Sequence, residues 1–330
     1  MNEHNKKFIL QRLSLLTCAS TIFLIFVGGL VTSTGSGLAV PDWPLSYGMV
    51  FPPMVGGVFY EHGHRMVATV VGFLMLVLAI LTAKFEKRTW VRTLAFIGLG
   101  AVITQGILGG ITVIYFLPLW VSVSHGILAQ TFLCITVILA YSFSQERASR
   151  EHENTTIDSK FLWSILTLIG FIYLQLIVGA IMRHSHSGLA IPDFPTMGGE
   201  WWPRFDQTMQ NTINRIRFDM NLEPVTFGQI HIHLAHRVGA MVLLLTLVIL
   251  NFRGLNTAKN NPLIQQTLFI LNTLFVVQIA LGIITVLSDK EYHFTSLHVV
   301  TGAVVLAWTV LLFLRTAPLK FKNFKKALNQ

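Results

Sequence analysis

The stretch Gly37-Leu-Ala-Val-Pro-Asp-Trp-Pro44 returns 151 residues later as Gly188-Leu-Ala-Ile-Pro-Asp-Phe-Pro195. Landmarks kept in one order along both halves of a chain indicate an internal duplication. After the first landmark the offset grows by 21 residues, which places an insertion in the corresponding loop of the second half. Three more landmarks follow at offsets of 172 or 173 residues: His64-Arg65 with His236-Arg237, Gln105-x3-Gly109-x2-Thr112 with Gln278-x3-Gly282-x2-Thr285, and His125 with His298.

The composition is that of a membrane protein rather than a soluble globule. Of the 330 residues, 53% are hydrophobic and only 12% are charged. A run such as Met66 to Ala83 carries no charge, whereas a soluble helix would show a polar face there. A bilayer span needs about 20 apolar residues. We therefore predict eight transmembrane helices near 13–33, 62–83, 93–115, 120–143, 161–182, 233–252, 263–287 and 294–314.

The net charge of +9 is explained by topology and does not indicate a nucleic-acid partner. With the N-terminus inside, 17 of the 24 Lys and Arg fall in inner segments, which predicts cytoplasmic termini. We read the first span as a retained helix rather than a signal peptide. Each half then holds four helices, 1–150 and 151–330. We expect an all-α protein of two tandem four-helix bundles, related by a pseudo-two-fold axis along the membrane normal.

Four histidines recur at matched places near the start of even-numbered spans: His64, His125, His236 and His298. This position puts them near the outer surface, about 3–9 Å inside each helix start. Ionisable residues inside a membrane are costly and mark functional sites. Paired imidazoles on neighbouring helices suit the two axial positions of haem iron. We therefore predict two sites, His64 with His125 and His236 with His298. Zinc is less favoured because no third or fourth ligand recurs.

Charged residues beside these histidines suggest further roles. Arg65 and Arg237 directly follow a predicted ligand and could bind haem propionates in bidentate fashion, with interfacial snorkelling as the alternative. Glu61 lies three residues before His64 on the same helical face, and its counterpart is His233. The carboxylate could act as a base or stabilise a cationic intermediate. The alternative is an acid favoured by the helix dipole.

Other features are predicted to be structural or stay unassigned. The segment from Phe205 to Met220 has helical spacing and could form a surface helix over the bundle. Both cysteines, Cys18 and Cys134, fall within spans and are expected to pack as small apolar residues. The remaining outer histidines could line an entrance or bind a transient metal, although solvated or helix-end roles are favoured for them: His184, His186, His231 and His233.

On these residues the chain resembles the haem A synthase family, whose members convert haem O to haem A. The resemblance spans the whole chain and is carried by Glu61-x-x-His64-Arg65, His125, His236-Arg237, His298 and the Gly-Leu-Ala-Val-Pro-Asp-Trp-Pro loop. It implies oxidation of the C8 methyl of haem O to a formyl group by successive hydroxylation. It also implies haem O beside His64, His125 and the catalytic Glu61, and a resident haem b between His236 and His298.

The same resemblance implies a multi-pass protein of a prokaryotic plasma membrane, with haem sites toward the outer side. Haem O synthase and an electron acceptor are the partners it suggests. One departure concerns the cysteine pair that many bacterial members carry in the first outer loop. This chain has Val40 and Ser46 in that region and no loop cysteine, which argues against a thiol–disulfide step.

Two other classes of protein compete with this reading. A membrane di-haem b-type cytochrome that only transfers electrons would use the four histidines equally well, and only Glu61 argues against it. A transporter built from parallel repeats would need polar groups near the bilayer midplane. The polar mid-span residues are glutamines that are better explained as hydrogen bonds between helices: Gln105, Gln130, Gln175 and Gln278.

Overall fold

A computed structural model describes residues 2–150, 159–202, 206–259 and 261–318. Within these residues the chain is all-helical, and eight of its helices are long and apolar enough to cross a membrane, as predicted. A short helix, α5 (Gln145–Ser149), follows the fourth of them. The eight are α1 (Glu3–Ser33), α2 (Gly57–Phe85), α3 (Thr89–Ile114), α4 (Leu119–Ser142), α6 (Ser159–His184), α8 (Phe227–Lys259), α9 (Pro262–Leu287) and α10 (Tyr292–Thr316).

Several helices extend beyond the apolar runs that predicted them. The helix α1 begins at Glu3, where the Asn2 side chain accepts a hydrogen bond from the Asn5 amide. The helix α8 begins at Phe227, six residues before the predicted span. Hydropathy marks only the part of a helix that lies in hydrocarbon, so polar first turns escape it. This extension brings His231 and His233 onto the same helix as His236.

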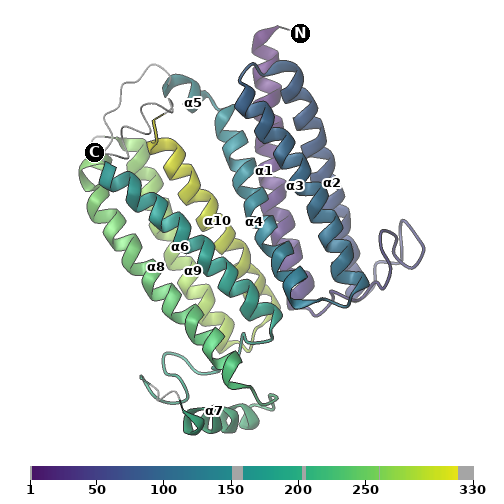
Figure 1. The fold of residues 1–330 in the computed structure, drawn as a ribbon, viewed down its shortest axis with the longest axis vertical. Helices are drawn as coiled ribbons and strands as arrows, with labels where there is room; N and C mark the ends of the chain where they lie inside the picture. Colours follow the sequence, from purple (N-terminus) through teal and green to yellow (C-terminus); the bar gives the residue numbers. More distant parts are fainter. Residues whose placement is uncertain (1, 151–158, 203–205, 260, 319–330) are drawn as a thin grey trace.

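The helices of each half pack in the same cyclic order. In the first half α1 packs on α2, α2 on α3, α3 on α4 and α4 on α1; α6, α8, α9 and α10 form the same kind of ring. Consequently α2 faces α4 across the first ring, and α8 faces α10 across the second. The two groups lie side by side (Figure 1), and they meet where α1 and α4 pack on α10 and α4 packs on α6. The pseudo-two-fold axis stays a prediction.

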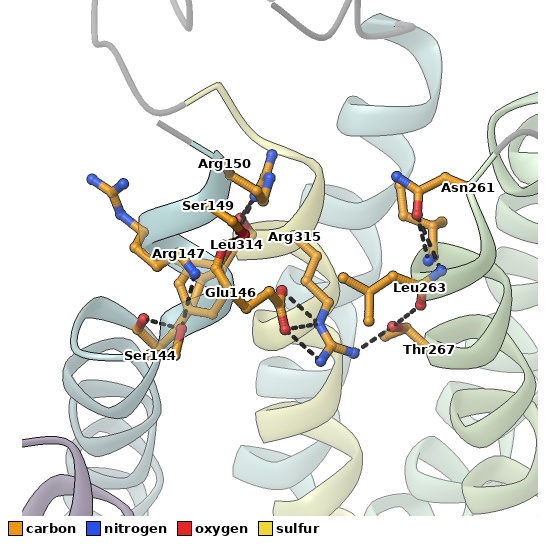
Figure 2. A network of polar contacts seen from close by, with 12 residues as sticks. Ser144, Glu146, Arg147, Ser149, Arg150, Asn261, Leu263, Thr267, Leu314 and Arg315 are labelled. Carbon is orange, nitrogen blue, oxygen red and sulfur yellow. Dashed lines mark hydrogen bonds and ion pairs between the residues drawn. The ribbon is translucent and has the colours of Figure 1, made fainter. Parts of the chain in front are cut away.

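One end of the molecule is held together by a polar clamp between the halves. The start of α1, the helix α5 and the end of α10 all lie at this end (Figure 1). Figure 2 shows the Arg315 guanidinium of α10 donating through Nε and Nη2 to the Glu146 carboxylate of α5. Its Nη1 donates to the Thr267 hydroxyl of α9. Arg150 donates to the Leu314 carbonyl at 2.6 Å. The clamp therefore fixes the first half against α9 and α10.

The predicted surface helix is present as α7 (Gln207–Asp219), which lies at the opposite end, beyond the ends of the long helices (Figure 1). Asp206 caps its start by accepting from the Met209 amide. Arg217, in the last turn of α7, is buried and donates to the carbonyl oxygens of Leu189 and Glu223. Phe205, the first residue of the predicted segment, lies outside the described residues.

Both cysteines occur as free thiols, as expected from their positions within spans. Cys18 on α1 and Cys134 on α4 are partly buried against the largest apolar cluster. That cluster includes residues of both halves, such as Leu133 of α4 and Phe161 of α6. The two rings of helices therefore meet in this cluster, while the first ring also has an apolar cluster of its own that includes Met75 and Leu139.

Candidate functional site

Each of the four repeated histidines lies against a glycine on the preceding long helix. A Cβ atom added at Gly28, Gly179 or Gly282 would approach the imidazole Cε1 to 3.0–3.2 Å, closer than an ordinary contact, whereas one at Gly109 would lie at an ordinary 3.4 Å. A side chain at the three tighter positions would force the imidazole to shift by a few tenths of an ångström. The pairs are Gly28 with His64 (3.0 Å), Gly109 with His125 (3.4 Å), Gly179 with His236 (3.2 Å) and Gly282 with His298 (3.0 Å).

The structure brings His236 of α8 and His298 of α10 together across the second ring. Their ring centroids lie 6.3 Å apart, with the ring planes inclined by 72°. Two imidazoles that bind one metal ion from opposite sides, each with a metal–nitrogen distance of about 2 Å, have centroids about 6.4 Å apart. The observed separation therefore fits a haem iron held between the two side chains. His64 of α2 and His125 of α4 occupy the facing helices of the first ring.

The two pairs differ in the hydrogen-bond partners of the Nδ1 atoms of their imidazoles. Nδ1 of His298 lies 3.2 Å from the Gln278 carbonyl oxygen, and Nδ1 of His236 lies 3.1 Å from the Gln175 side-chain amide. Among the described residues, Nδ1 of His64 and Nδ1 of His125 are buried without a hydrogen-bond partner. A ligating imidazole donates its other ring N–H to an acceptor, which fixes its orientation. The Gln278 carbonyl is such an acceptor for His298, whereas the Gln175 amide donates to Nδ1 of His236. The second pair therefore has a hydrogen-bond partner at each Nδ1, and the first pair does not.

Glu61 is buried at the start of α2 with both carboxylate oxygens engaged. It is 4% exposed, accepts from the Val40 amide at 2.7 Å, and pairs with Arg65 at 2.6 Å. His233, its counterpart, is 3% exposed, and its Nδ1 accepts from the Ile191 amide at 3.3 Å. Val40 and Ile191 occupy equivalent places in the repeated loops. Both side chains thus hold the loop, and only Glu61 adds a negative charge.

The two arginines also hold these loops. Arg65 donates to the carbonyl oxygens of Asp42 and Leu45, each at 2.8 Å. Arg237 donates to the equivalent carbonyls, those of Asp193 at 2.7 Å and Thr196 at 3.0 Å. The guanidinium groups therefore support the loops above the histidines. Contact with haem propionates stays a prediction for both.

Each loop is closed by an aspartate that binds backbone amides. Asp42 accepts from the Tyr47 and Gly48 amides, and the hydrogen bond from Gly48 is the main cause that lowers the pKa of this carboxyl. For Asp193, burial acts to raise the pKa, but hydrogen bonds from Thr196 and Gly199 outweigh it and lower the pKa. Both carboxylates are therefore ionised at neutral pH and hold the turns that follow.

An aromatic side chain from the first loop closes over the first ring. The Trp43 indole packs on α3 at Gly110, where an added Cβ would lie 2.6 Å from its ring. Gly110 directly follows Gly109, which contacts His125. In the second half Phe194 replaces the tryptophan and lies 5.8 Å from the Arg237 guanidinium instead. The covers of the two histidine pairs are therefore different.

Comparison with known proteins identifies the family of this chain. The family model described as cytochrome oxidase assembly protein (COX15-CtaA) matches residues 11–57 and 54–310. The chain belongs to this family. It is 27% identical to the heme A synthase of Bacillus licheniformis over 88% of this chain and 90% of that protein. It is 26% identical to the heme A synthase of Halalkalibacterium halodurans, over 86% of this chain and 89% of that protein.

The remaining outer histidines do not form a metal site in the described part of the chain. No group of three or more His, Cys, Asp or Glu side chains is arranged there to hold a metal ion. Nδ1 of His62 lies 2.8 Å from the Ser46 hydroxyl, and Nδ1 of His231 lies 2.9 Å from the Phe227 carbonyl. His186 adopts a positive φ of 56° just after α6. The contact of His62 supports the first loop, and that of His231 lies within the first turn of α8.

Sequence reasoning missed the role of the glycines and of one arginine. Gly109 and Gly282 belong to a repeated motif, and Gly28 and Gly179 recur at the offset of 151 residues, but contact with an imidazole on another helix appears only after folding. No role was predicted for Arg183, which lies on the last turn of α6 and reaches α1. Its signal in the sequence is an arginine at the edge of an apolar span, aligned with the neutral Thr32 of the first half.

Proposed function

We propose that this membrane protein is a haem A synthase, an oxidoreductase that converts the C8 methyl of haem O to a formyl group. One observation carries the proposal. Two histidine pairs stand at matched places of a duplicated frame, each imidazole seated against a glycine, in a chain that the family model matches over most of its length. The heme A synthases named above align with this chain over 88% and 86% of its length.

The two halves are assigned different haems. A resident haem b needs permanently positioned ligands, and both His236 and His298 are held at Nδ1. The Gln278 carbonyl can accept the Nδ1–H of a ligating His298, and the Gln175 amide holds His236 by donating to its Nδ1. A substrate must enter and leave, and His64 and His125 lack such partners among the described residues. We therefore assign haem O to residues 1–150 and haem b to residues 151–330. Bound there, haem b would supply a one-electron acceptor for the oxidation.

Glu61 is the residue assigned to catalysis beside the substrate. Its carboxylate lies one helical turn before His64, and the second half has the neutral His233 in its place. A buried negative charge stabilises positive charge that develops on a neighbouring reactant and can accept a proton. Because both oxygens also hold Val40 and Arg65, proton uptake at Glu61 would loosen the loop above the site.

Placement in the cell follows from the same assignment. The chain is a multi-pass membrane protein, and the charge distribution favours cytoplasmic termini with the histidine pairs toward the outer side. A haem O synthase is the proposed source of the substrate. The haem b would pass its electrons to a separate acceptor.

The test is conversion of haem O by the purified protein. The full chain in detergent is supplied with haem O, an oxidant and oxygen, and the extracted haems are separated by chromatography and identified by mass. Hydroxylated and formyl haems are expected, with none from a double variant that replaces His64 and His125 by alanine. If haem O is recovered unchanged while a bis-histidine haem is present and reducible, the chain is an electron-transfer cytochrome instead.

A further inference from the structure

Arg183 is a cation at the junction of the two histidine pairs. From the last turn of α6 its Nη2 donates to the Gly29 carbonyl of α1 at 2.6 Å and to the Ser33 hydroxyl at 2.9 Å. The Ser33 hydroxyl also accepts from the Ser296 hydroxyl of α10 at 3.1 Å. Arg183 thus links three helices from both halves.

Each of these contacts lies beside a candidate haem ligand. Gly29 follows Gly28, whose backbone contacts the His64 ring. Ser296, which is linked to Arg183 through the Ser33 hydroxyl, comes two residues before His298 on α10. Arg183 also comes one helical turn after Gly179, which contacts His236. The guanidinium is therefore adjacent to the second pair and connected to the first.

The charge of Arg183 is not neutralised by a nearby acid. Within the described residues no Asp or Glu forms an ion pair with it. Other positive groups lie near: burial lowers the pKa of Lys290, and the charges of Arg217 and Arg183 lower it further. Arg183, Arg217 and Lys290 therefore lie close enough together at this end of the second ring to act on one another. A cation kept inside a membrane protein at such cost is a mark of function.

The first half has no equivalent charge. The residue aligned with Arg183 is Thr32, whose hydroxyl donates to the Gly28 carbonyl of its own helix. The frame is duplicated, but this charge is found on one side only. The two histidine pairs therefore lie in different electrostatic fields.

We propose that Arg183 raises the reduction potential of a haem bound between His236 and His298, which makes this haem the electron acceptor of the pair. Reduction adds one electron to ferric haem and lowers its net charge by one. A fixed positive charge nearby stabilises the reduced form, and the effect is large because the surroundings are apolar. Arg183 acts on this site through the electrostatic field of its charge, so it is a positioning residue and not a catalytic one. This inference rests on the proposed haem b site.

The test is a potentiometric titration of the full-length protein in detergent, loaded with haem b. Arg183→Gln removes the charge, and Arg183→Lys keeps it on a different side chain. Arg215→Gln is the matched control, because it removes an exposed arginine of α7 at the same end of the molecule. The midpoint potential of the low-spin haem is measured for each variant, together with its haem content and absorption bands.

We expect a lower midpoint potential in Arg183→Gln, with potentials close to wild type in Arg183→Lys and Arg215→Gln. An unchanged potential in Arg183→Gln would overturn the proposal. So would an equal fall in Arg183→Lys, because geometry rather than charge would then be responsible. Loss of haem from Arg183→Gln alone would also overturn it, since the charge would then serve binding. Absence of a low-spin haem from the wild-type protein would instead refute the haem site itself.

Discussion

Replacing Gly282 by alanine tests whether the glycines that contact the four histidines, called the glycine seats below, are needed for haem ligation. The new Cβ would lie 3.0 Å from Cε1 of His298, whereas carbon atoms in ordinary contact are about 3.5–4.0 Å apart. The ring has little room to yield, because its Nδ1 is held 3.2 Å from the Gln278 carbonyl on the same helix as Gly282. The imidazole must therefore shift by about 0.5–1 Å relative to α9.

A shift of this size exceeds what a metal–imidazole bond tolerates, which is about 0.2 Å. Overfilling a packed site costs about 1–2.7 kcal/mol, equivalent to roughly 5- to 100-fold weaker haem binding. The substitution itself does not weaken the helix, because alanine is favoured over glycine there by about 0.5–1 kcal/mol. Any loss of haem can thus be assigned to the contact with His298.

The assay is transfer of haem from the purified protein to excess apomyoglobin, followed by absorbance. Gly170→Ala on α6 is the matched control, because a Cβ there meets nothing within 4 Å. We expect the Gly282→Ala protein to lose haem about 5- to 100-fold faster than this control and to show a weaker low-spin spectrum. A haem loss rate and spectrum equal to those of Gly170→Ala would refute the reasoning.

Three other predictions concern charged groups. Glu61→Gln keeps an acceptor for the loop amide and is expected to retain haem while lowering formyl-haem yield by about 100-fold or more; a wild-type yield would remove the carboxylate from the mechanism. Arg315→Leu leaves Glu146, 25% exposed, without its partner, and should lower the free energy of unfolding by about 1–3 kcal/mol, seen as a lower thermal midpoint with an unchanged haem spectrum. Because the folded pKa of Asp193 lies below its ordinary value, the loop should be fully stable above about pH 4 and loosen only as the pH falls through that lower pKa; faster amide exchange of residues 196–200 already at pH 5, corrected for intrinsic rates, would contradict this.

The spans and their order could be predicted because hydropathy and repeated landmarks are properties of the sequence alone. The ends of helices could not be predicted as well. The helix α8 carries His231 and His233 in its first turns, so its apolar run begins later than its hydrogen bonds. The structural repeat of the loops continues beyond the quoted motif, because the isolated β-bridge between Ser46 and Met49 has an equivalent between Met197 and Glu200. These equivalent turns are formed by unlike residues.

Only part of the candidate site could be predicted from the sequence. The four histidines repeat and could be paired by position, but the reason each can enter its ring is a glycine on another helix. The arginines were assigned to propionates from their place beside a ligand, while in the structure Arg65 and Arg237 hold the loop carbonyls. Proximity in sequence indicates which groups are near a site and does not show which partner each selects.

The duplication explains which features can carry function. Features present in both halves, such as the loop aspartates and the glycine seats, build the common frame, since they recur whatever each half binds. Features present in one half only must account for any difference in chemistry. Three such features converge: Glu61 against His233, Thr32 against Arg183, and the presence of Nδ1 partners only in the second pair. Negative charge beside unanchored imidazoles favours a site of reaction and exchange. Positive charge beside anchored imidazoles favours a haem that stays bound and accepts electrons.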